Sequence, residues 1–171
     1  TIEADATANP LRWMRWLVPQ NEFLRLDAPA KLYRAGNQAL GKSTVGLAEV
    51  IHRCLGTHPY AFCKPPPVRW IICSLNRSQS LAIQAKLHEL LPGDALDLRC
   101  VYDAKTGYGA NNPVTTFANG STIKWVTDDQ GPRSVAGATV DGVLVDEPCS
   151  PEMLRELEKR LLMRRGILLM T

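Results

Sequence analysis

The chain has 171 residues, 45% of them hydrophobic, and a formal net charge of +3. This length suits one domain with a sizeable core, and this composition excludes an intrinsically disordered chain. No apolar run reaches the roughly 18 residues that would cross a bilayer, so we expect no membrane association. The net charge alone does not identify a nucleic-acid partner.

The first half of the chain alternates between helix and strand patterns. A short amphipathic helix is predicted over 10–18, and a strand over 31–35. A glycine-bearing loop at 36–41 leads into a helix over 43–55. The next apolar run, 68–74, is typical of a strand buried on both faces of a parallel sheet.

The second half continues the alternation. We expect the remaining elements to be a helix over 76–91, a strand over 96–102, a loop over 105–113, hairpin strands over 115–117 and 122–126, a polar surface loop over 128–137, a strand over 142–145, a helix from Ser150 to about Arg164 and a last strand from Ile167. The hairpin prediction depends on Asn119-Gly120, a strong turn signal.

These elements predict an α/β fold with a mostly parallel central sheet, flanked by helices and extended by antiparallel additions at one edge. A Rossmann dinucleotide site fits poorly, because no GxGxxG motif follows the first predicted strand.

The loop after the first predicted strand matches the P-loop template G-x-x-x-x-G-K-[ST] in full. The match consists of Gly36, Asn37, Gln38, Ala39, Leu40, Gly41, Lys42 and Ser43, and Thr44 follows it. Backbone N–H groups of such a loop, and the positive end of the helix after it, bind phosphates. Lys42 would contact the β and γ phosphates, and the Ser43 hydroxyl would bind Mg²⁺. We therefore expect these residues to bind ATP together with Mg²⁺.

An acid pair follows the buried strand 142–145. Asp146 is placed to hold Mg²⁺, most simply through a water, and Glu147 is placed to orient and deprotonate the attacking water. This pair argues for hydrolysis, because a small-molecule kinase has less use for a base at that position.

Three further polar residues are candidates for the same site. Arg133, in the loop before the acid strand, is the preferred source of an arginine that offsets charge on the γ-phosphate, and Arg34 is the second choice. Gln20 could read the adenine edge, because an amide both donates and accepts; an ordinary surface amide is an equal alternative.

Two other clusters favour structural interpretations. The basic residues within 155–165 are interleaved with glutamates, which indicates a solvated helix face more than a DNA contact. His52, Cys54, His58 and Cys63 raise the possibility of zinc, but their spacing matches no zinc pattern, so reduced thiols of a cytosolic protein are preferred.

Several of these motifs together resemble one known family. Residues 35–44 with 48–60, the hairpin 117–123 and the acid strand 143–148 are similar to the large terminase subunit of tailed bacteriophages. The resemblance implies a P-loop NTPase fold of the ASCE type, in an ATPase that drives double-stranded DNA into a procapsid. It also implies a homo-oligomeric ring on the portal protein, a small terminase subunit as partner, and a place in the host cell cytoplasm with transient docking at the procapsid portal.

The same resemblance assigns roles to individual residues. Gln20 falls at the family's adenine contact, Lys42 and Ser43 in its P-loop, and Asp146 and Glu147 at its metal-binding and catalytic acids. By the same resemblance, Thr171 would begin the family's coupling motif.

Two departures bear on the rest of the protein. Asn37 and Gln38 stand where many members carry a P-loop arginine, which leaves the source of that arginine open. No acid cluster suits two-metal DNA cleavage, so we expect residues 1–171 to be a single P-loop ATPase domain, a fragment without the nuclease domain.

Alternatives remain from two other classes. A helicase-like DNA-dependent ATPase would share the P-loop and acid pair, but the two-domain type needs a second motor domain for which this chain has no room. A P-loop kinase or a nucleotide-gated binding module is disfavoured by Glu147, although not excluded.

Overall fold

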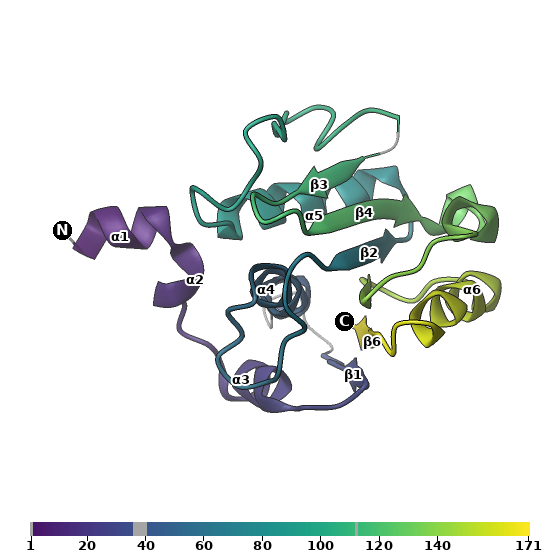
Figure 1. Ribbon diagram of the computed structural model, residues 1–171, viewed down its shortest axis with the longest axis horizontal. Helices are drawn as coiled ribbons and strands as arrows, with labels where there is room; N and C mark the ends of the chain where they lie inside the picture. The colour runs from purple at the N-terminus through teal and green to yellow at the C-terminus, as the bar shows by residue number, and fades with distance from the viewer. Residues whose placement is uncertain (1, 36–40, 112) are drawn as a thin grey trace.

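The computed structural model describes residues 2–35, 41–111 and 113–171. Strands and helices alternate along much of the chain (Figure 1). The α-helices are α1 (Ile2–Ala8), α2 (Pro10–Trp13), α3 (Val18–Arg25), α4 (Lys42–Leu55), α5 (Arg77–Leu90) and α6 (Pro151–Leu162). The strands are β1 (Ala30–Leu32), β2 (Arg69–Ser74), β3 (Val114–Thr116), β4 (Thr122–Thr127), β5 (Gly142–Val145) and β6 (Ile167–Met170). None of the helices in these ranges is long and apolar enough to span a membrane.

The six strands form one sheet in the order β1-β6-β5-β2-β4-β3. All neighbouring pairs are parallel except β3 and β4, which are antiparallel. The predicted α/β class, with a mostly parallel sheet and an antiparallel addition at one edge, is therefore confirmed. The Asn119-Gly120 turn joins β3 to β4, and Gly120 has the positive φ of 83° that such a turn demands.

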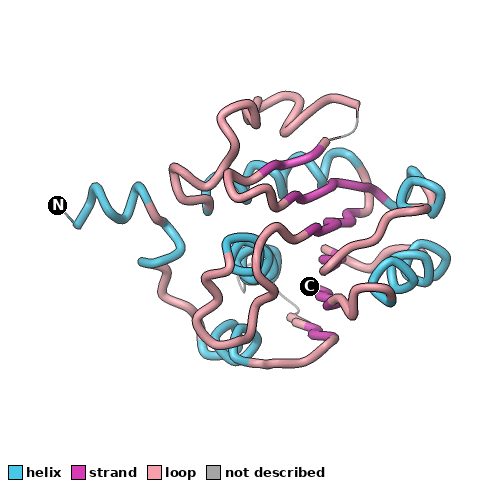
Figure 2. The backbone as a smooth tube through the Cα atoms, viewed as in Figure 1, coloured by secondary structure: helices cyan, strands magenta, loops and turns pink. Residues whose placement is uncertain are grey.

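Side chains of the central strands alternate between two hydrophobic cores. Ile72 and Leu144 belong to the core that includes α4 and α5, whereas Ile71 and Val143 belong to the core that includes α6. In Figure 2 the strands accordingly lie between α4 on one side and α6 on the other. This is the three-layer arrangement that covers both faces of a parallel sheet and leaves its carboxyl edge open for a site.

Local sequence sets the ends of α4 and the start of α6. α4 begins after Gly41 and ends at Gly56, and both glycines have left-handed backbone conformations, with φ of 59° and 71°. α6 begins at Ser150, whose hydroxyl accepts a hydrogen bond from the N–H of Met153 at 3.3 Å, and Pro151 occupies the first turn.

A buried ion cluster fixes α4 to β1. The Glu49 carboxylate lies 2.8 Å from Lys31 Nζ, 2.7 Å from Arg53 Nε and 2.8 Å from His58 Nε2. The side chains of Glu49 and Lys31 are both 0% exposed. Burial raises the pKa of Glu49, but His58 and then Lys31 outweigh that effect and hold the pKa at about 2.

Several predicted boundaries differ from the structure. The predicted helix over 10–18 is wrong in extent, because α2 ends at Trp13 and a separate helix, α3, begins at Val18 with Pro19 in its first turn. α1 was not predicted. The strand predicted over 31–35 is the shorter β1. The polar segment 128–137 contains two short 3₁₀ helices, η2 (Asp128–Gln130) and η3 (Pro132–Val135).

The strand predicted over 96–102 is wrong. Within it, only Leu96 forms a bridge to another segment. The Asp97 carboxylate instead accepts a hydrogen bond from the backbone N–H of Arg99 at 2.9 Å, which bends the chain into a local turn. Leu98, which the strand pattern would bury, is 99% exposed.

Candidate nucleotide-binding site

The carboxyl edge of the sheet brings several of the predicted site residues together. The acid pair follows β5, Thr171 follows β6, and α4 begins with Lys42 and Ser43. Ser43, Asp146 and Glu147 line one cavity of about 170 Å³ with residues of α5. Sequence reasoning had placed all three in one site although roughly 100 residues separate the two motifs.

The P-loop itself is only partly described. Residues 36–40, which are Gly36, Asn37, Gln38, Ala39 and Leu40, lie outside the described residues. Gly41, Lys42, Ser43 and Thr44 are described, and all four are partly buried at the start of α4. The predicted helix after the loop is confirmed, so its N-terminus presents backbone N–H groups at this edge.

Asp146 is a buried carboxylate, 7% exposed. Its Oδ1 accepts a hydrogen bond from the Thr171 hydroxyl at 2.9 Å. Among the described residues it has no ion-pair partner, since no basic nitrogen lies within 4.0 Å of it. A buried carboxylate with one hydrogen bond and no cation is costly, so this environment favours a bound cation.

Glu147 is exposed and has a backbone conformation that is rare for a residue with a side chain. Its φ is 67°, in the left-handed region, and its N–H donates to the Thr171 carbonyl at 3.0 Å. Strain of this kind costs on the order of 1–3 kcal/mol and is concentrated at functional sites. One consequence is that the side chain turns away from the direction that a continuing strand would give it.

Helix α5 supplies residues that sequence reasoning did not select. Gln79, Ile83 and Lys86 follow the three- and four-residue spacing of one helical face, and all line the cavity. Gln79 Nε2 donates to Glu147 Oε2 at 3.0 Å, and the buried Gln79 Oε1 has no partner among the described residues. No sequence signal marked these residues, because they reach the acid pair only through the strand order: α5 follows β2, which lies beside β5 in the sheet.

Gln20 lies against the end of the P-loop. Its side chain is buried, its Oε1 accepts from the Leu17 N–H at 2.9 Å, and its Nε2 donates to the Gly41 carbonyl at 3.3 Å. A Cβ on Gly41 would come within 2.6 Å of that Nε2, and the φ of 59° at Gly41 independently favours glycine there. Contact with adenine stays a prediction.

The two candidate arginines lie outside the cavity. Arg133 is an exposed residue of η3, and Arg34 is exposed after β1. Neither lines the cavity that contains the acid pair. Arg133 could therefore contribute to a nucleotide site only in another arrangement, either by reaching the site of a neighbouring copy or after a movement of η3.

The residues present suit Mg²⁺. A serine hydroxyl and a carboxylate are hard oxygen donors, which this ion prefers, and it commonly takes only one or two protein ligands besides phosphate oxygens and water. Within the described ranges, no group of three or more histidine, cysteine, aspartate or glutamate side chains is arranged to hold a metal. An ion held by Ser43, Asp146 and nucleotide phosphates fits this pattern.

The fold and the site define the class of protein: an α/β protein in which the end of a P-loop sequence and an acid pair lie at the carboxyl edge of the same sheet. Residues 32–164 match the family described as terminase large subunit, T4likevirus-type, N-terminal. The chain belongs to this family, as the resemblance of its motifs predicted.

Two similar solved structures support the fold. One is the large terminase ATPase domain of Thermus phage P74-26, with 20% identity and a TM-score of 0.68. The other is an arginine-to-alanine mutant of that domain, with 21% identity and a TM-score of 0.66. Each alignment covers 94% of this chain and 66% of the other, so the chain spans slightly less than two thirds of their length. No curated protein matches the chain.

Proposed function

We propose that this chain is the ATPase domain of a viral DNA-packaging motor, which hydrolyses Mg²⁺-bound ATP to move double-stranded DNA into a procapsid. Family membership supports the packaging role. The observation that supports the enzymatic part is that the buried Asp146, which has no basic partner among the described residues, lines one cavity with Ser43 and Glu147. In this proposal 1–171 forms a single ATPase domain.

The binding step uses groups at the start of α4. The P-loop, residues 36–44, would surround the phosphates, and Lys42 would contact the β and γ phosphates. Ser43 and Asp146 would hold Mg²⁺, which supplies charge neutralisation at the phosphates when bound. Thr171 holds one Asp146 oxygen by a 2.9 Å hydrogen bond and so limits rotation of the carboxylate.

The hydrolytic step uses Glu147 as general base toward a water that attacks the γ-phosphate. The Gln79 amide, 3.0 Å from Glu147 Oε2, restricts where that carboxylate points. Lys86, from the same face of α5, adds positive charge to the cavity. Arg133 would act on the γ-phosphate of a neighbouring copy, and Gln20 would contact adenine.

The assembly would be a homo-oligomeric ring on the portal protein, in the host cytoplasm, with the small terminase subunit as a further partner. The protein would contact DNA mainly at the DNA phosphates, so the affinity of the protein for DNA should fall steeply as the salt concentration rises. DNA affinity that is insensitive to salt would contradict this part of the proposal.

The test is ATP hydrolysis measured against protein concentration, with DNA present. Activity should rise more than proportionally with concentration if copies complete one another's sites. Arg133→Ala and Lys42→Ala should each be inactive alone, and a mixture should recover activity, because each supplies the group that the other lacks. A mixture as inactive as its components would contradict a role for Arg133 in a neighbouring site, and an inactive native chain at every concentration would count against the ATPase proposal.

A further inference from the structure

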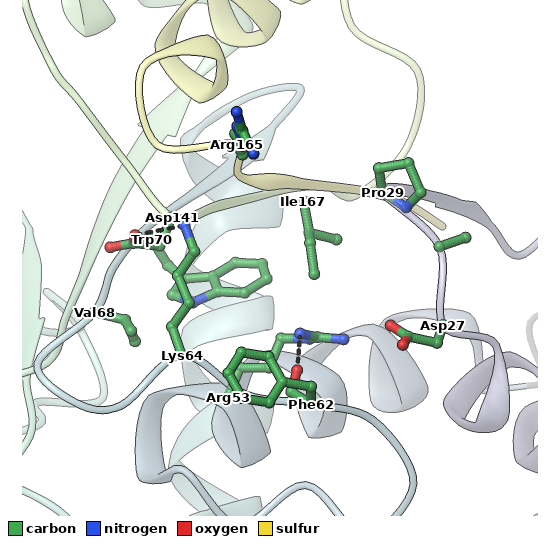
Figure 3. A pocket seen from close by; sticks show the side chains of 11 residues that line it. Asp27, Pro29, Arg53, Phe62, Lys64, Val68, Trp70, Asp141, Arg165 and Ile167 are labelled. Carbon is green, nitrogen blue, oxygen red and sulfur yellow. Dashed lines mark hydrogen bonds and ion pairs between the residues drawn. The ribbon is translucent and has the colours of Figure 1, made fainter.

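Another cavity, of about 290 Å³, is shown in Figure 3. It lies at the opposite edge of the sheet from the candidate nucleotide site. It opens where β2 and β6 begin, whereas the acid pair follows the end of β5. Val68, Trp70 and Ile167 give it an apolar wall. It shares no lining residue with the cavity that contains Asp146 and Glu147, so it is a separate feature of the molecule.

Arg53 lines this cavity although its side chain is only 7% exposed. Its Nε donates to Glu49 at 2.7 Å, and its Nη1 donates to the Phe62 carbonyl at 3.3 Å. Its Nη2 is buried and has no partner among the residues that the structure describes. In Figure 3 the guanidinium lies between Phe62 and Asp27. An arginine fork in this state is suited to a carboxylate, which accepts from two of its donors at once.

The charges around the cavity favour an anionic ligand. The lining contains three basic side chains, Arg53, Lys64 and Arg165, and two acidic ones, Asp27 and Asp141. Asp141 already accepts hydrogen bonds from the Arg69 N–H at 3.0 Å and from Lys64 at 3.1 Å. Lys31 and Arg53 pair with Glu49, and Arg164 pairs with Asp141, so five basic side chains face three carboxylates in this region and positive charge is in excess. This excess favours an anion, and the two lining carboxylates repel a phosphate dianion more strongly than a singly charged carboxylate.

The volume and the apolar lining of the cavity indicate the size and shape of the remainder of the ligand. A volume of about 290 Å³ is in the range of small-molecule sites, which are mostly apolar with a few orienting polar groups. Trp70 is 2% exposed and forms part of a fixed wall, whereas Phe62 is 78% exposed. A flat apolar group between Trp70 and Phe62 would remove the Phe62 ring from water, which is favourable because exposed aromatic surface costs free energy.

We propose that this cavity is a binding site for a small monocarboxylate with a flat apolar body, whose carboxylate completes the hydrogen bonding of Arg53. The ligand body packs between Phe62 and the wall formed by Trp70 and Ile167. This site is independent of the proposed ATPase function.

The test is a titration of the native chain with 3-phenylpropionate, and separately with its neutral amide, by calorimetry and by NMR of the tryptophan indole N–H signals. The acid should bind one per chain and shift the Trp70 signal more than those of Trp13 and Trp125. The amide should bind at least about tenfold more weakly. Equal affinity for acid and amide, or no binding of the acid up to about 10 mM, would overturn the proposal.

Variants locate the contact. Arg53→Lys keeps a cation beside Glu49 but loses the fork, and should weaken binding about tenfold, whereas Arg99→Lys, at an exposed arginine, should not change it. Phe62→Ala removes an exposed ring without disturbing the core, and should also weaken binding if Arg53→Lys does not fold. Unchanged affinity in Phe62→Ala would overturn the assignment to this cavity, and so would unchanged affinity in an Arg53→Lys variant that folds.

Discussion

The buried ion cluster around Glu49 joins β1 to α4, the two elements that precede and follow the P-loop. In Glu49→Gln, two cations, Lys31 and Arg53, would remain buried without their carboxylate. Breaking a buried ion pair by removing one partner costs about 3–5 kcal/mol. The lowered pKa of Glu49 indicates a similar free energy. The pKa is about 2 instead of the usual 4.5. At 1.36 kcal/mol for each pH unit, this difference of roughly 2.5 corresponds to about 3 kcal/mol.

The assay is urea unfolding with the free energy extrapolated to water. We expect Glu49→Gln to lose about 3 kcal/mol, a large part of the 5–15 kcal/mol typical of a domain. Glu156→Gln is the matched control, because Glu156 is partly exposed and pairs within α6 with Lys159, whose side chain is 60% exposed, and with Arg160; this change should cost less than about 1 kcal/mol. Adding Lys31→Met to Glu49→Gln should recover part of the loss, since one unpaired ammonium disappears. Equal losses in Glu49→Gln and Glu156→Gln would refute the reasoning.

Further predictions concern pH, packing and the site. Because the folded pKa of Glu49 lies below its usual 4.5, its contribution to stability is complete above about pH 4.5 and is lost as pH falls toward 2; in acid titrations of unfolding free energy, Glu49→Gln should lack this part of the decline. Gly142→Ala should lower stability by about 1–3 kcal/mol, because its Cβ would come within 2.3 Å of the Trp70 ring, whereas Gly93→Ala, with no atom within 4 Å, should be near neutral in the same thermal melts. Glu147→Gln should reduce kcat for ATP about 10²–10⁴-fold and leave nucleotide binding intact. Gln79→Ala should lower kcat with little change in KM, and a native kcat in this variant would contradict a role for Gln79 in positioning Glu147.

Local patterns predicted most of the fold because they depend on short-range chemistry. The P-loop with its following helix, the Asn119-Gly120 hairpin and the buried strand before Asp146 were all recognisable from a few consecutive residues. The strand order was not predictable in this way, since it depends on which strands pack together. The false strand over 96–102 shows the limit, because a hydrogen bond that the Asp97 carboxylate accepts from the Arg99 N–H outweighed an apolar pattern.

Residues of the candidate site could be predicted where they belong to a sequence motif. They could not be predicted where only tertiary packing brings them to the site. Gln79 and Lys86 reach the cavity only because α5 lies across the strands that end there. Likewise, the sequence placed His58 in a possible zinc cluster, whereas in the structure its Nε2 lies 2.8 Å from Glu49. Glu49 and Arg53 follow the i, i+4 spacing of one helical face, but no spacing rule brings Lys31 and His58 to them, so the full buried network could be found only from the folded chain.

The central claim is that the start of α4 and the acid pair form a site for Mg²⁺ and ATP. Its most direct test is calorimetric titration of the chain with a non-hydrolysable ATP analogue in the presence of Mg²⁺. The account predicts one nucleotide bound per chain, at least about tenfold weaker binding in Lys42→Ala, and native binding in Lys105→Ala, which alters an exposed lysine far from the motif in sequence. Equal binding by all three proteins, or no binding by the native chain, would contradict it.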